Sequence, residues 1–445
     1  MTDSHLMKHC QQALDSTRRH SADEVEVFGQ TQRTISVEIE KADLQTTKSQ
    51  QETMIGVRAF TNRQVGFSCS NSIVDLESVC LDAVKLAKAS PADPNNVLPQ
   101  PDPFEPVVGL YDPAAESYSA SDAVKRAIEI LEIAAAYDKR VIVGNGAISV
   151  NVVERCIVNS NGLAAGERGS VFSYYALTTA RDGDQVSNMA FDFGASRTVA
   201  GIELEPVVRN ACERALGSLG AAPGESFSGQ IILSPDAVSD ILGGLLLFQT
   251  NARNVLTGSS RWGDKLGQAI AHSSLTVVDD ARLEEGVASS SFDREGVPRA
   301  RREIIRDGEL VSLFHNAYTS QAMGTPNTGH ASGGARSIPG IGPTNLMVLP
   351  GDVSKDDLIA DMKQGLLVTR YSGHADPISG DFSGVAKGAF LIKNGKIERP
   401  VSGTLIAGNA FDALRQLSGI SSETARVFSS VLPYLRLESI SVTAG

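Results

Sequence analysis

The chain has 445 residues, more than one hydrophobic core usually supports, so two or three domains are expected. Hydrophobic residues make up 42% and charged residues 21%, an ordinary globular composition that excludes a collagen-like, coiled-coil or disordered chain. The formal net charge is −12, from 40 Lys and Arg against 52 Asp and Glu. This balance argues against direct nucleic-acid binding, which needs a basic surface.

The sequence predicts a cytoplasmic protein that does not enter a membrane. The first residues, MTDSHLMKHCQQALDSTRRH, lack the apolar stretch and cleavage site of a signal peptide. The longest apolar run, residues 241–248, is too short to cross a bilayer. The five cysteines form no CxxC pair, and such scattered cysteines are typical of reduced thiols.

Residues 1–90 are predicted to form an N-terminal α+β unit. A short opening helix precedes the strand-like segments DEVEVFG, TISVEIEKADLQTTKSQ and ETMIGVRAF, in which apolar and polar residues alternate. The sequence TNRQ then predicts a turn, and Asp75 opens a helix with apolar residues on one face. Residues 91–118 read as an extended linker, because seven of the 18 prolines fall between Pro91 and Pro113.

Residues 119–222 are predicted to form a second α+β unit that repeats the first. A helix, SDAVKRAIEILEIAAAYD, precedes strand-like segments, and a further helix is expected over residues 199–216. The order of helix, long antiparallel hairpins and helix therefore occurs twice. This order predicts an internal duplication, although the two sequences are not visibly similar.

Residues 223–445 are predicted to form a mostly antiparallel, barrel-like β domain. The unit begins with a strand and a helix whose start is marked by Ser234, Pro235 and Asp236. Turn sequences such as DREG and RDGE then recur, and Asn394-Gly395 between two apolar stretches is a strong hairpin signal. The fold class predicted for the whole chain is α+β.

The histidines do not form an obvious metal site. Four of the seven lie in the third unit (His272, His315, His330 and His374), where no cysteine could complete a zinc site. His330 and His374 lie in sequences that predict solvated loops. His5 and His9 are spaced i, i+4 at the N-terminus without an acid beside them. We interpret all six as exposed or structural histidines.

Three other polar or aromatic features are interpreted as structural. Adjacent residues of a strand point to opposite faces, so Asp279 and Asp280 should not cooperate as an acid–base pair, and a strand-end turn is expected. The basic run that contains Arg299 and Arg306 predicts a solvated strand face. Trp262 is expected to be either an interface anchor or a core residue of its own domain.

Several blocks of the chain carry a family resemblance. In the third unit they are FDREGVPRARREIIRDGELVSLFHN, GPTNLMVLPGD, SGDFSGVAKGAFLIKNGKIERPV and TLIAGN, and in the first unit GVRAFTNRQVGFSCSN and LDAVKLAKASPADP. These blocks resemble the TldD/PmbA family, formerly called modulators of DNA gyrase. The resemblance covers nearly the whole chain in the right order.

The resemblance implies that the chain lacks the family's metal site. In the TldD branch, a histidine-glutamate-three residues-histidine motif on a helix and a cysteine near the C-terminus bind a catalytic metal. The corresponding stretch here is LLFQTNARNVLTG, with Gln249 and Asn254 at the histidine positions and Thr250 at the glutamate position. An amide is a poor zinc ligand, and a threonine hydroxyl cannot act as the general base. The final segment, VLPYLRLESISVTAG, has no cysteine. We therefore expect the PmbA (TldE) branch, with no catalytic residue, metal or cofactor in this chain.

Members of this branch pair with a TldD-type subunit, which would supply the metal, and together they enclose a chamber that cuts short or unfolded peptides. The expected assembly is thus a homo- or heterodimer that handles peptide substrates. Extended peptides pair with strand edges and closely approaching backbone, which glycines allow. Candidates for a peptide-cleft rim are Gly329, Gly333, Gly334, Gly340 and Gly342, although these glycines are also typical of plain turns.

Two alternatives stay open at this point. The chain could be an autonomous metallopeptidase with a relocated metal site that includes His315, His330 or His374. It could also be a homodimeric peptide-binding or scaffolding protein with no proteolytic role. Metal content, and hydrolysis with and without a TldD-type partner, distinguish these possibilities from a non-catalytic partner subunit. Nothing in the residues supports a link to gyrase.

Overall fold

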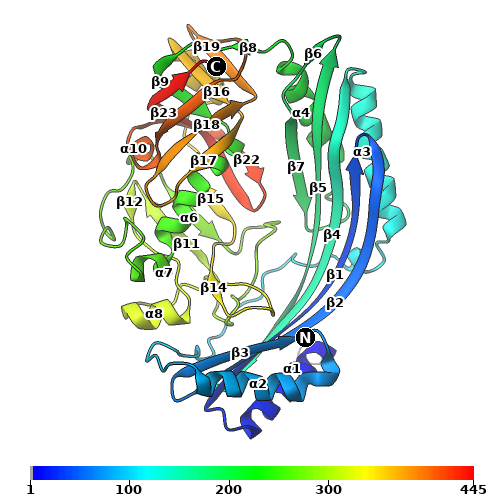
Figure 1. Cartoon of the computed structure of the whole chain (residues 1–445), viewed down its shortest axis with the longest axis vertical. Helices are drawn as coiled ribbons and strands as arrows, with labels where there is room; N and C mark the ends of the chain where they lie inside the picture. Colours follow the sequence, from blue (N-terminus) through cyan, green and yellow to red (C-terminus); the bar gives the residue numbers. More distant parts are fainter. Residues whose placement is uncertain (1–3) are drawn as a thin grey trace.

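The computed structural model describes residues 4–445 and has two main parts (Figure 1). The first is a curved seven-stranded antiparallel sheet with four helices, and the second is a C-terminal body built on a 14-stranded sheet. The chain is therefore a mixed α+β protein, as predicted. Within residues 4–445, no helix is long and apolar enough to cross a membrane.

The N-terminal sheet is built from very long hairpins. Its strand order is β3-β2-β1-β4-β5-β6, and β7 also pairs with β5. The elements of this part are α1 (His5–Arg19), β1 (Glu24–Glu40), β2 (Asp43–Thr61), β3 (Gln64–Ser70), α2 (Leu76–Ala89), α3 (Ala120–Tyr137), β4 (Val141–Asn159), β5 (Ala164–Asp182), β6 (Gln185–Val186), β7 (Ala190–Ser196) and α4 (Leu204–Gly217). The segments predicted as separate short strands merge into β1 and β2, because tight turns occur only at Lys41–Ala42 and at the predicted Asn62–Arg63.

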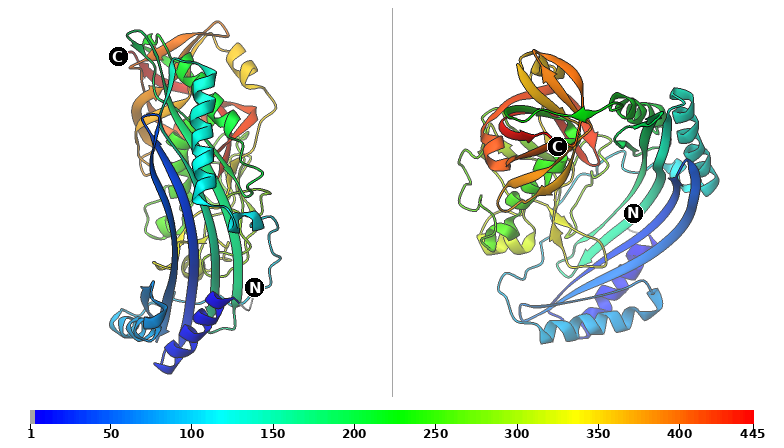
Figure 2. Two further views of the ribbon diagram at one scale, coloured as in Figure 1. Left: turned by 90° about the vertical axis from the view of Figure 1, so that its right-hand side faces the viewer. Right: turned by 45° about the horizontal axis from the view of Figure 1, so that its top comes forward.

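Alternation along β1 gives the sheet two different faces. Val25 and Val27 pack against α1 and α2, which cover one end of the sheet. Further along the same face, Ile35 belongs to the core that α3 and α4 complete. Phe28 points the other way and packs against residues of the C-terminal body. Figure 2 shows the helices at the two ends of the long strands. The sheet thus connects one helical layer to the second half of the molecule.

The two predicted α+β units share this one sheet. Strand β1 pairs with β4 along its length, from Glu26–Asn159 to Glu40–Asn145. The order of helix, strands and helix occurs in residues 5–89 and again in residues 120–217. The internal duplication itself stays a prediction, as do the domain boundaries.

The C-terminal body has a mixed sheet that branches at β23. Three pairings are parallel (β9–β16, β15–β23 and β8–β20), so the sheet is not purely antiparallel. Its strands are β8 (Ala222–Pro223), β9 (Phe227–Leu233), β10 (Val277–Asp280), β11 (Arg301–Arg306), β12 (Glu309–Leu310), β15 (Leu346–Val348), β16 (Gln364–Val368), β17 (Arg370–Ala375), β18 (Asp381–Lys387), β19 (Ala389–Lys393), β20 (Lys396–Ser402), β21 (Leu405–Asn409), β22 (Leu417–Val427) and β23 (Ser430–Thr443), with a separate pair β13 (Ala331–Ser332) and β14 (Gly340–Ile341). Its helices are α5 (Pro235–Val238), α6 (Gly244–Thr250), α7 (Ala252–Leu256), α8 (Ala317–Met323), α9 (Lys355–Ala360) and α10 (Ala410–Arg415).

Local signals in this body lie where the sequence predicts them. Ser234 caps α5 by accepting a hydrogen bond from the Ala237 amide, and Pro235 occupies the first turn. Asn394 and Gly395 both have positive φ angles and connect β19 to β20 in a tight hairpin. The predicted helix start and hairpin are confirmed.

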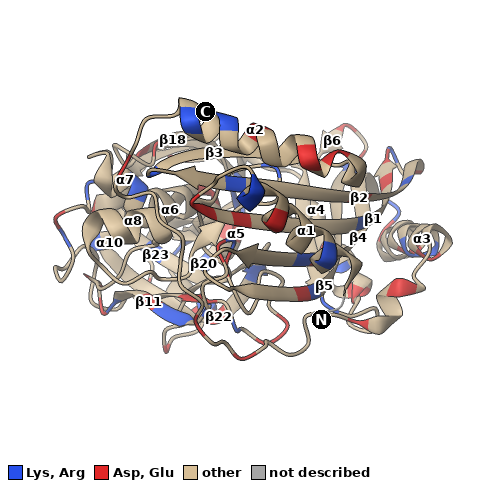
Figure 3. Ribbon diagram, turned by 90° about the horizontal axis from the view of Figure 1, so that it is seen from below, with Lys and Arg blue, Asp and Glu red and all other residues tan. Residues whose placement is uncertain are grey.

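Acidic and basic residues are mixed over the molecule. Figure 3 shows Lys and Arg interspersed with Asp and Glu on the ribbon as seen from below. The proline-rich stretch from Ser90 to Asp112 contains no helix or strand and contacts both parts of the fold, through Arg63 and Tyr318. Several of its residues help to form the pocket described next.

Candidate functional site

The stretch that corresponds to the family's metal motif is split between two short helices. Gln249 and Thr250 end α6, whereas Asn254 lies on α7. Asn251 separates the helices with extended backbone angles, φ −73° and ψ 113°, and its side chain accepts a hydrogen bond from the Arg253 amide. Asn251 is therefore the N-cap of α7, and the three motif positions do not share one continuous helix.

Gln249 is fully buried, and both ends of its amide are occupied. Its Nε2 donates to the Pro377 carbonyl at 2.5 Å. Its Oε1 accepts from the Arg261 amide at 2.6 Å and from the Ser260 hydroxyl at 3.0 Å. This side chain fastens two loops to the end of α6.

Thr250 and Asn254 are also committed to local hydrogen bonds. The buried Thr250 hydroxyl donates to the Leu246 carbonyl at 2.6 Å, and Asn254 Nδ2 donates to the Phe248 carbonyl at 2.9 Å. An amide oxygen binds zinc poorly, and a hydroxyl that already donates to a carbonyl cannot deprotonate water. The residues at these three positions do not fit a catalytic metal.

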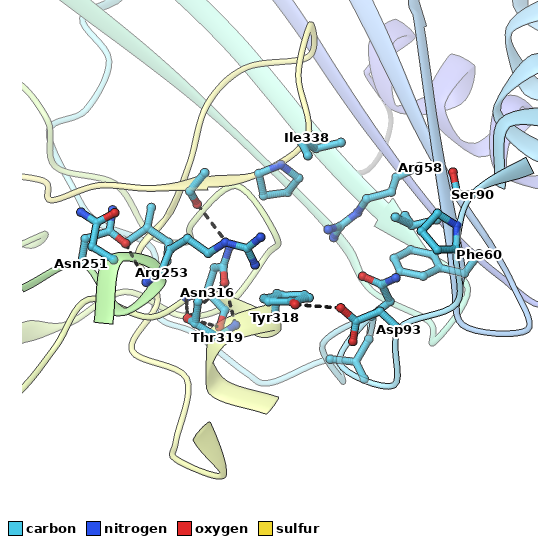
Figure 4. Close-up of a pocket in the computed structure, with 18 residues that line it drawn as sticks. Arg58, Phe60, Ser90, Asp93, Asn251, Arg253, Asn316, Tyr318, Thr319 and Ile338 are labelled. Carbon is cyan, nitrogen blue, oxygen red and sulfur yellow. Dashed lines mark hydrogen bonds between the residues drawn. The ribbon is translucent and has the colours of Figure 1, made fainter. Parts of the chain in front are cut away.

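A pocket of about 600 Å³ lies beside Asn254, between the two parts of the fold (Figure 4). Its walls come from β2, the proline-rich linker, the starts of α7 and α8, and the loop before β14. Residues that line it include Arg58, Phe60, Asp93, Val97, Asn251, Arg253, Asn254, Asn316, Tyr318, Ile338 and Gly340. The volume is in the range of pockets that hold small molecules or short peptide segments.

Two polar residues that line this pocket, Asp93 and Tyr318, are hydrogen-bonded to each other. Asp93 accepts from the Tyr318 hydroxyl at 2.7 Å and from the Asn95 amide at 2.9 Å. The bonds from Asn95 and Tyr318 lower the pKa of Asp93, so this carboxylate is a weak base. The guanidinium carbon of Arg253 lies over the Tyr318 ring, 4.7 Å from the ring centre. Apolar walls with side-chain amides and two guanidinium groups suit a polar chain such as a peptide.

Arg58, which lines the pocket, also belongs to a buried ion cluster. We call Glu26, Arg58, Arg294 and Glu295 the interdomain ion cluster, because the first two come from the N-terminal sheet and the others from the C-terminal body. Arg58 Nη2 donates to Glu26 at 2.6 Å and to Glu295 at 2.8 Å. Arg294 Nη1 donates to the second oxygen of Glu26 at 2.9 Å. Burial alone would lower the pKa of Arg58, but Glu26 and Glu295 together raise it.

Sequence reasoning missed this cluster. The segment with Arg294 and Glu295 reads as a surface turn, whereas both side chains are at most 2% exposed. The turn itself is present, since Gly296 has a positive φ angle, but it is inserted against the N-terminal sheet. No local signal distinguishes an inserted charged turn from an exposed one.

Of the five candidate rim glycines, one lines the pocket and four do not. Gly340 lines the pocket. Gly329 and Gly333 have positive φ angles of 72° and 117°, which suits the turn interpretation. Gly334 lies near Gln30 of β1, and Gly342 lies against Ser332. The loop between β13 and β14 therefore rests on the N-terminal sheet and closes the pocket from that side.

His330 lies in a loop, as predicted, but the predicted solvation is wrong, because the residue is 1% exposed. His330 Nε2 lies 3.1 Å from the buried Asp279 carboxylate, which also accepts from the Thr344 hydroxyl at 2.7 Å. Burial, with further repulsion from His330, lowers the pKa of His315 to about 4. Both histidines are thus core residues. His374 is exposed as predicted but lies in β17 rather than in a loop.

The other histidines and the acidic pair are mainly structural. His272 is exposed and contacts Ser274, and the rings of His5 and His9 meet on α1 with Nε2 atoms 3.0 Å apart. Asp279 and Asp280 face opposite sides of β10, as predicted, and they end that strand directly before the turn at residues 281–282. Across residues 4–445, no group of three or more His, Cys, Asp or Glu side chains is arranged to hold a metal ion.

Trp262 is a core residue of the C-terminal body. Its side chain is 2% exposed and packs edge to face against Phe411. Arg306 of the basic run pairs with Glu303 on an exposed strand face, as predicted. Arg299 does not follow that prediction, because it lies against the N-terminal sheet and lines a cavity.

Residues 25–87, 113–219 and 227–444 match domain 1, the central domain and the C-terminal domain of the PmbA/TldA metallopeptidases. A metalloprotease of Methanothermobacter thermautotrophicus is 26% identical and spans 88% of this chain and 87% of its own. The metalloprotease PmbA of Escherichia coli is 28% identical over 72% of this chain and 68% of its own. Metalloprotease TldD homologues match at similar identity, for example 26% for that of Haemophilus influenzae.

Solved structures have the same fold. TldE from Thermococcus kodakarensis superposes with a TM-score of 0.89 at 23% identity, covering 98% of this chain and all of that one. A putative modulator of DNA gyrase from Thermotoga maritima gives a TM-score of 0.89 at 22% identity, with coverage of 98% and 99%. On these matches, the chain belongs to the PmbA/TldD metallopeptidase family.

Proposed function

We propose that this chain is the non-catalytic partner subunit of a TldD/TldE-type metallopeptidase complex. In this account a TldD-type subunit supplies the metal and the general base, and the complex cuts short or unfolded peptides in the cytoplasm. The present chain shapes the substrate chamber and contributes neither a metal ligand nor a catalytic residue.

The observation that carries the proposal is the hydrogen bonding at the motif positions. Gln249, Thr250 and Asn254 are neutral, and each has its donor engaged by a carbonyl. A metal site at this place would need other ligand residues. It would also break the side-chain hydrogen bonds that hold α6 and α7 in position. Relatives named PmbA and TldD match at similar identity, so the motif residues, rather than overall similarity, favour the partner branch.

The pocket beside Asn254 supports a role in peptide binding. Its wall contains the side-chain amides of Asn251 and Asn316; their oxygens cap α7 and α8, and their Nδ2 groups can donate to a peptide backbone. Gly340 begins the short strand β14 at the same wall, where a missing side chain lets another backbone approach. An extended peptide could pair there by strand addition.

The proposal is tested by reconstitution with a TldD-type subunit. The purified chain alone should not hydrolyse a set of short peptides, and the mixture should hydrolyse them faster than the TldD-type subunit alone. Binding of peptides without any hydrolysis in the mixture would instead favour a scaffolding protein. No effect on the partner's rate and no complex would contradict the proposal.

A filled pocket tests the part of the proposal that concerns substrate. A Cβ at Gly340 would have its nearest neighbour, Ser332 Oγ, at 3.5 Å, so Gly340→Phe fits the backbone and adds a ring at a residue that lines the pocket. We expect it to raise the KM of the complex more than it lowers kcat. Gly244→Phe is the matched control, because Gly244 is exposed and has no atom within 4 Å of an added Cβ. Equal effects of both variants would show that the pocket does not bind the substrate.

A further inference from the structure

A second cavity, of about 230 Å³, lies where strands β4 and β5 meet the C-terminal body. We call it the arginine cavity, because four arginines line it: Arg155, Arg168, Arg197 and Arg299. Glu167 is the single carboxylate among the lining residues, and Ser289 and Ser290 add hydroxyl groups. The cavity is separate from the pocket at Asn254, with which it shares no lining residue.

Two of the four guanidinium charges have carboxylate partners. Arg155 forms a short ion pair with Glu167, whose second oxygen accepts from the Ser291 amide at 3.0 Å. Arg168 forms a short ion pair with Glu116 outside the cavity. These two pairs leave Arg197 and Arg299 without a salt bridge in the described part of the chain.

Arg197 is held by neutral oxygens. Its Nη2 donates to the carbonyls of Gly286, Val287 and Ser289, each at 2.9 Å. Carbonyls satisfy hydrogen bonds but do not cancel a charge. The side chain is 6% exposed. Burial lowers the pKa of Arg197 to about 10, with the attraction of Glu167 opposed by repulsion from Arg155 and Arg426.

Arg299 has a donor that lacks an acceptor. Its Nη1 donates to the Ser290 hydroxyl at 3.0 Å and its Nη2 to the Ala331 carbonyl at 3.1 Å. The buried Nε has no partner among residues 4–445, and the same holds for Nε of Arg168. Burial, followed by repulsion from Arg155, lowers the pKa of Arg299 to about 10, although Asp293 and Asp279 act in the opposite sense.

The size and charge of the cavity define the class of ligand. A water molecule takes about 30 Å³, so the cavity holds several waters or one small ion, and it is smaller than the roughly 300–1,000 Å³ of typical ligand pockets. Two guanidinium groups without a salt bridge suit a small anion, and the planar arginine fork suits tetrahedral oxyanions. Nucleotides and peptides are too large.

We propose that the arginine cavity binds a small tetrahedral oxyanion, with inorganic phosphate as the simplest ligand, between Arg299, Arg197 and the Ser290 hydroxyl. The ion cancels the excess positive charge and accepts from the free Nε of Arg299. Because the lining residues come from both parts of the fold, the bound ion links the N-terminal sheet to the C-terminal body. This site does not depend on the proposed role in peptide hydrolysis.

Calorimetric titration of the full chain with inorganic phosphate, at constant ionic strength in chloride near neutral pH, tests the site. We expect one phosphate per chain and acetate binding that is at least about tenfold weaker. Arg299→Gln should weaken phosphate binding about tenfold or more, since it removes a charge-assisted hydrogen bond. The matched control is Arg301→Gln, because Arg301 is two residues away and its side chain is 50% exposed.

Three results would overturn the proposal: no binding of phosphate, equal binding by wild type and Arg299→Gln, or acetate binding as tight as phosphate. The last would reassign the cavity to a carboxylate. If Arg299→Gln does not fold, the proposal is tested by the thermal stability of the wild-type chain. Phosphate must then raise its Tm above that in chloride of equal ionic strength, since a ligand stabilises the state it binds. An unchanged Tm rejects the site.

Discussion

The boundary between the two parts of the fold contains two groups of arginines that differ in their carboxylate partners. In the interdomain ion cluster, Arg58 and Arg294 are matched by Glu26 and Glu295; the pKa of Arg58 is raised, whereas burial lowers that of Arg294. In the arginine cavity, Arg197 and Arg299 have no such match, and their pKa values are lowered to about 10. Arg58 has two carboxylate partners and Arg294 has one, whereas Arg197 and Arg299 have none among the described residues. A buried arginine with carboxylate partners is neutralised within the chain, whereas one bonded only to carbonyls and hydroxyls keeps its charge.

Glu26→Gln should cause the largest effect, because Glu26 accepts from both Arg58 and Arg294 and is 1% exposed. Breaking a buried pair leaves an uncompensated charge and costs about 3–5 kcal/mol. Chemical denaturation of the variant measures the loss of unfolding free energy. Glu205→Gln is the control, since the Glu205–Arg209 pair is exposed and worth less than about 1 kcal/mol. Equal losses of unfolding free energy would show that the interdomain ion cluster stabilises the fold no more than an exposed ion pair does.

The pH dependence of stability gives a smaller effect next to the same cluster. Burial and the charge of Glu295 raise the pKa of Asp293 to about 7. The native state therefore holds the proton more tightly than the unfolded state does. This contribution to stability is present below pH about 4 and is lost as the pH rises through about 7, by at most about 1.4 kcal/mol per pH unit.

The variant Asp293→Asn should remove this decline. Melting curves of wild type and variant between pH 4 and 7 measure the difference. We expect the gap between them to change steadily with pH in that window, with wild type relatively more stable at the acidic end. A gap that is independent of pH would show that Asp293 stays ionised throughout.

The smallest effect is expected at the arginine cavity without its anion. Arg299→Met should change the unfolding free energy by less than about 1.5 kcal/mol, because relief of an uncompensated buried charge offsets two lost hydrogen bonds. Arg294→Met should cost more, since it leaves Glu26 with one partner. If both variants lost the same unfolding free energy in phosphate-free buffer, the arginine cavity and the interdomain ion cluster would not differ in their contribution to stability.

The sequence predicts the local features of the fold better than the distant ones. The cap at Ser234, the hairpin at Asn394-Gly395 and the mixed α+β composition depend on neighbouring residues, and all are present. The pairing of β1 with β4 joins segments more than 100 residues apart, and no local pattern encodes it. Two predicted units therefore share one sheet.

The same reason explains what was missed at the candidate sites. The motif resemblance identifies Gln249, Thr250 and Asn254, but not the break at Asn251 or the carbonyls that occupy their side chains. The contact of Arg58 with Glu295 spans 237 residues and depends on a turn inserted against the sheet. Polar residues in a turn predict exposure to solvent. Their burial becomes evident only when the C-terminal body is seen packed against the N-terminal sheet.

The metal content of the isolated chain tests the central claim most directly. Elemental analysis of the purified chain, combined with a peptide hydrolysis assay in the presence and absence of a chelator, should find zinc well below one equivalent and no chelator-sensitive activity. About one equivalent of a transition metal, together with hydrolysis that the chelator abolishes, would contradict the assignment of this chain as a non-catalytic partner.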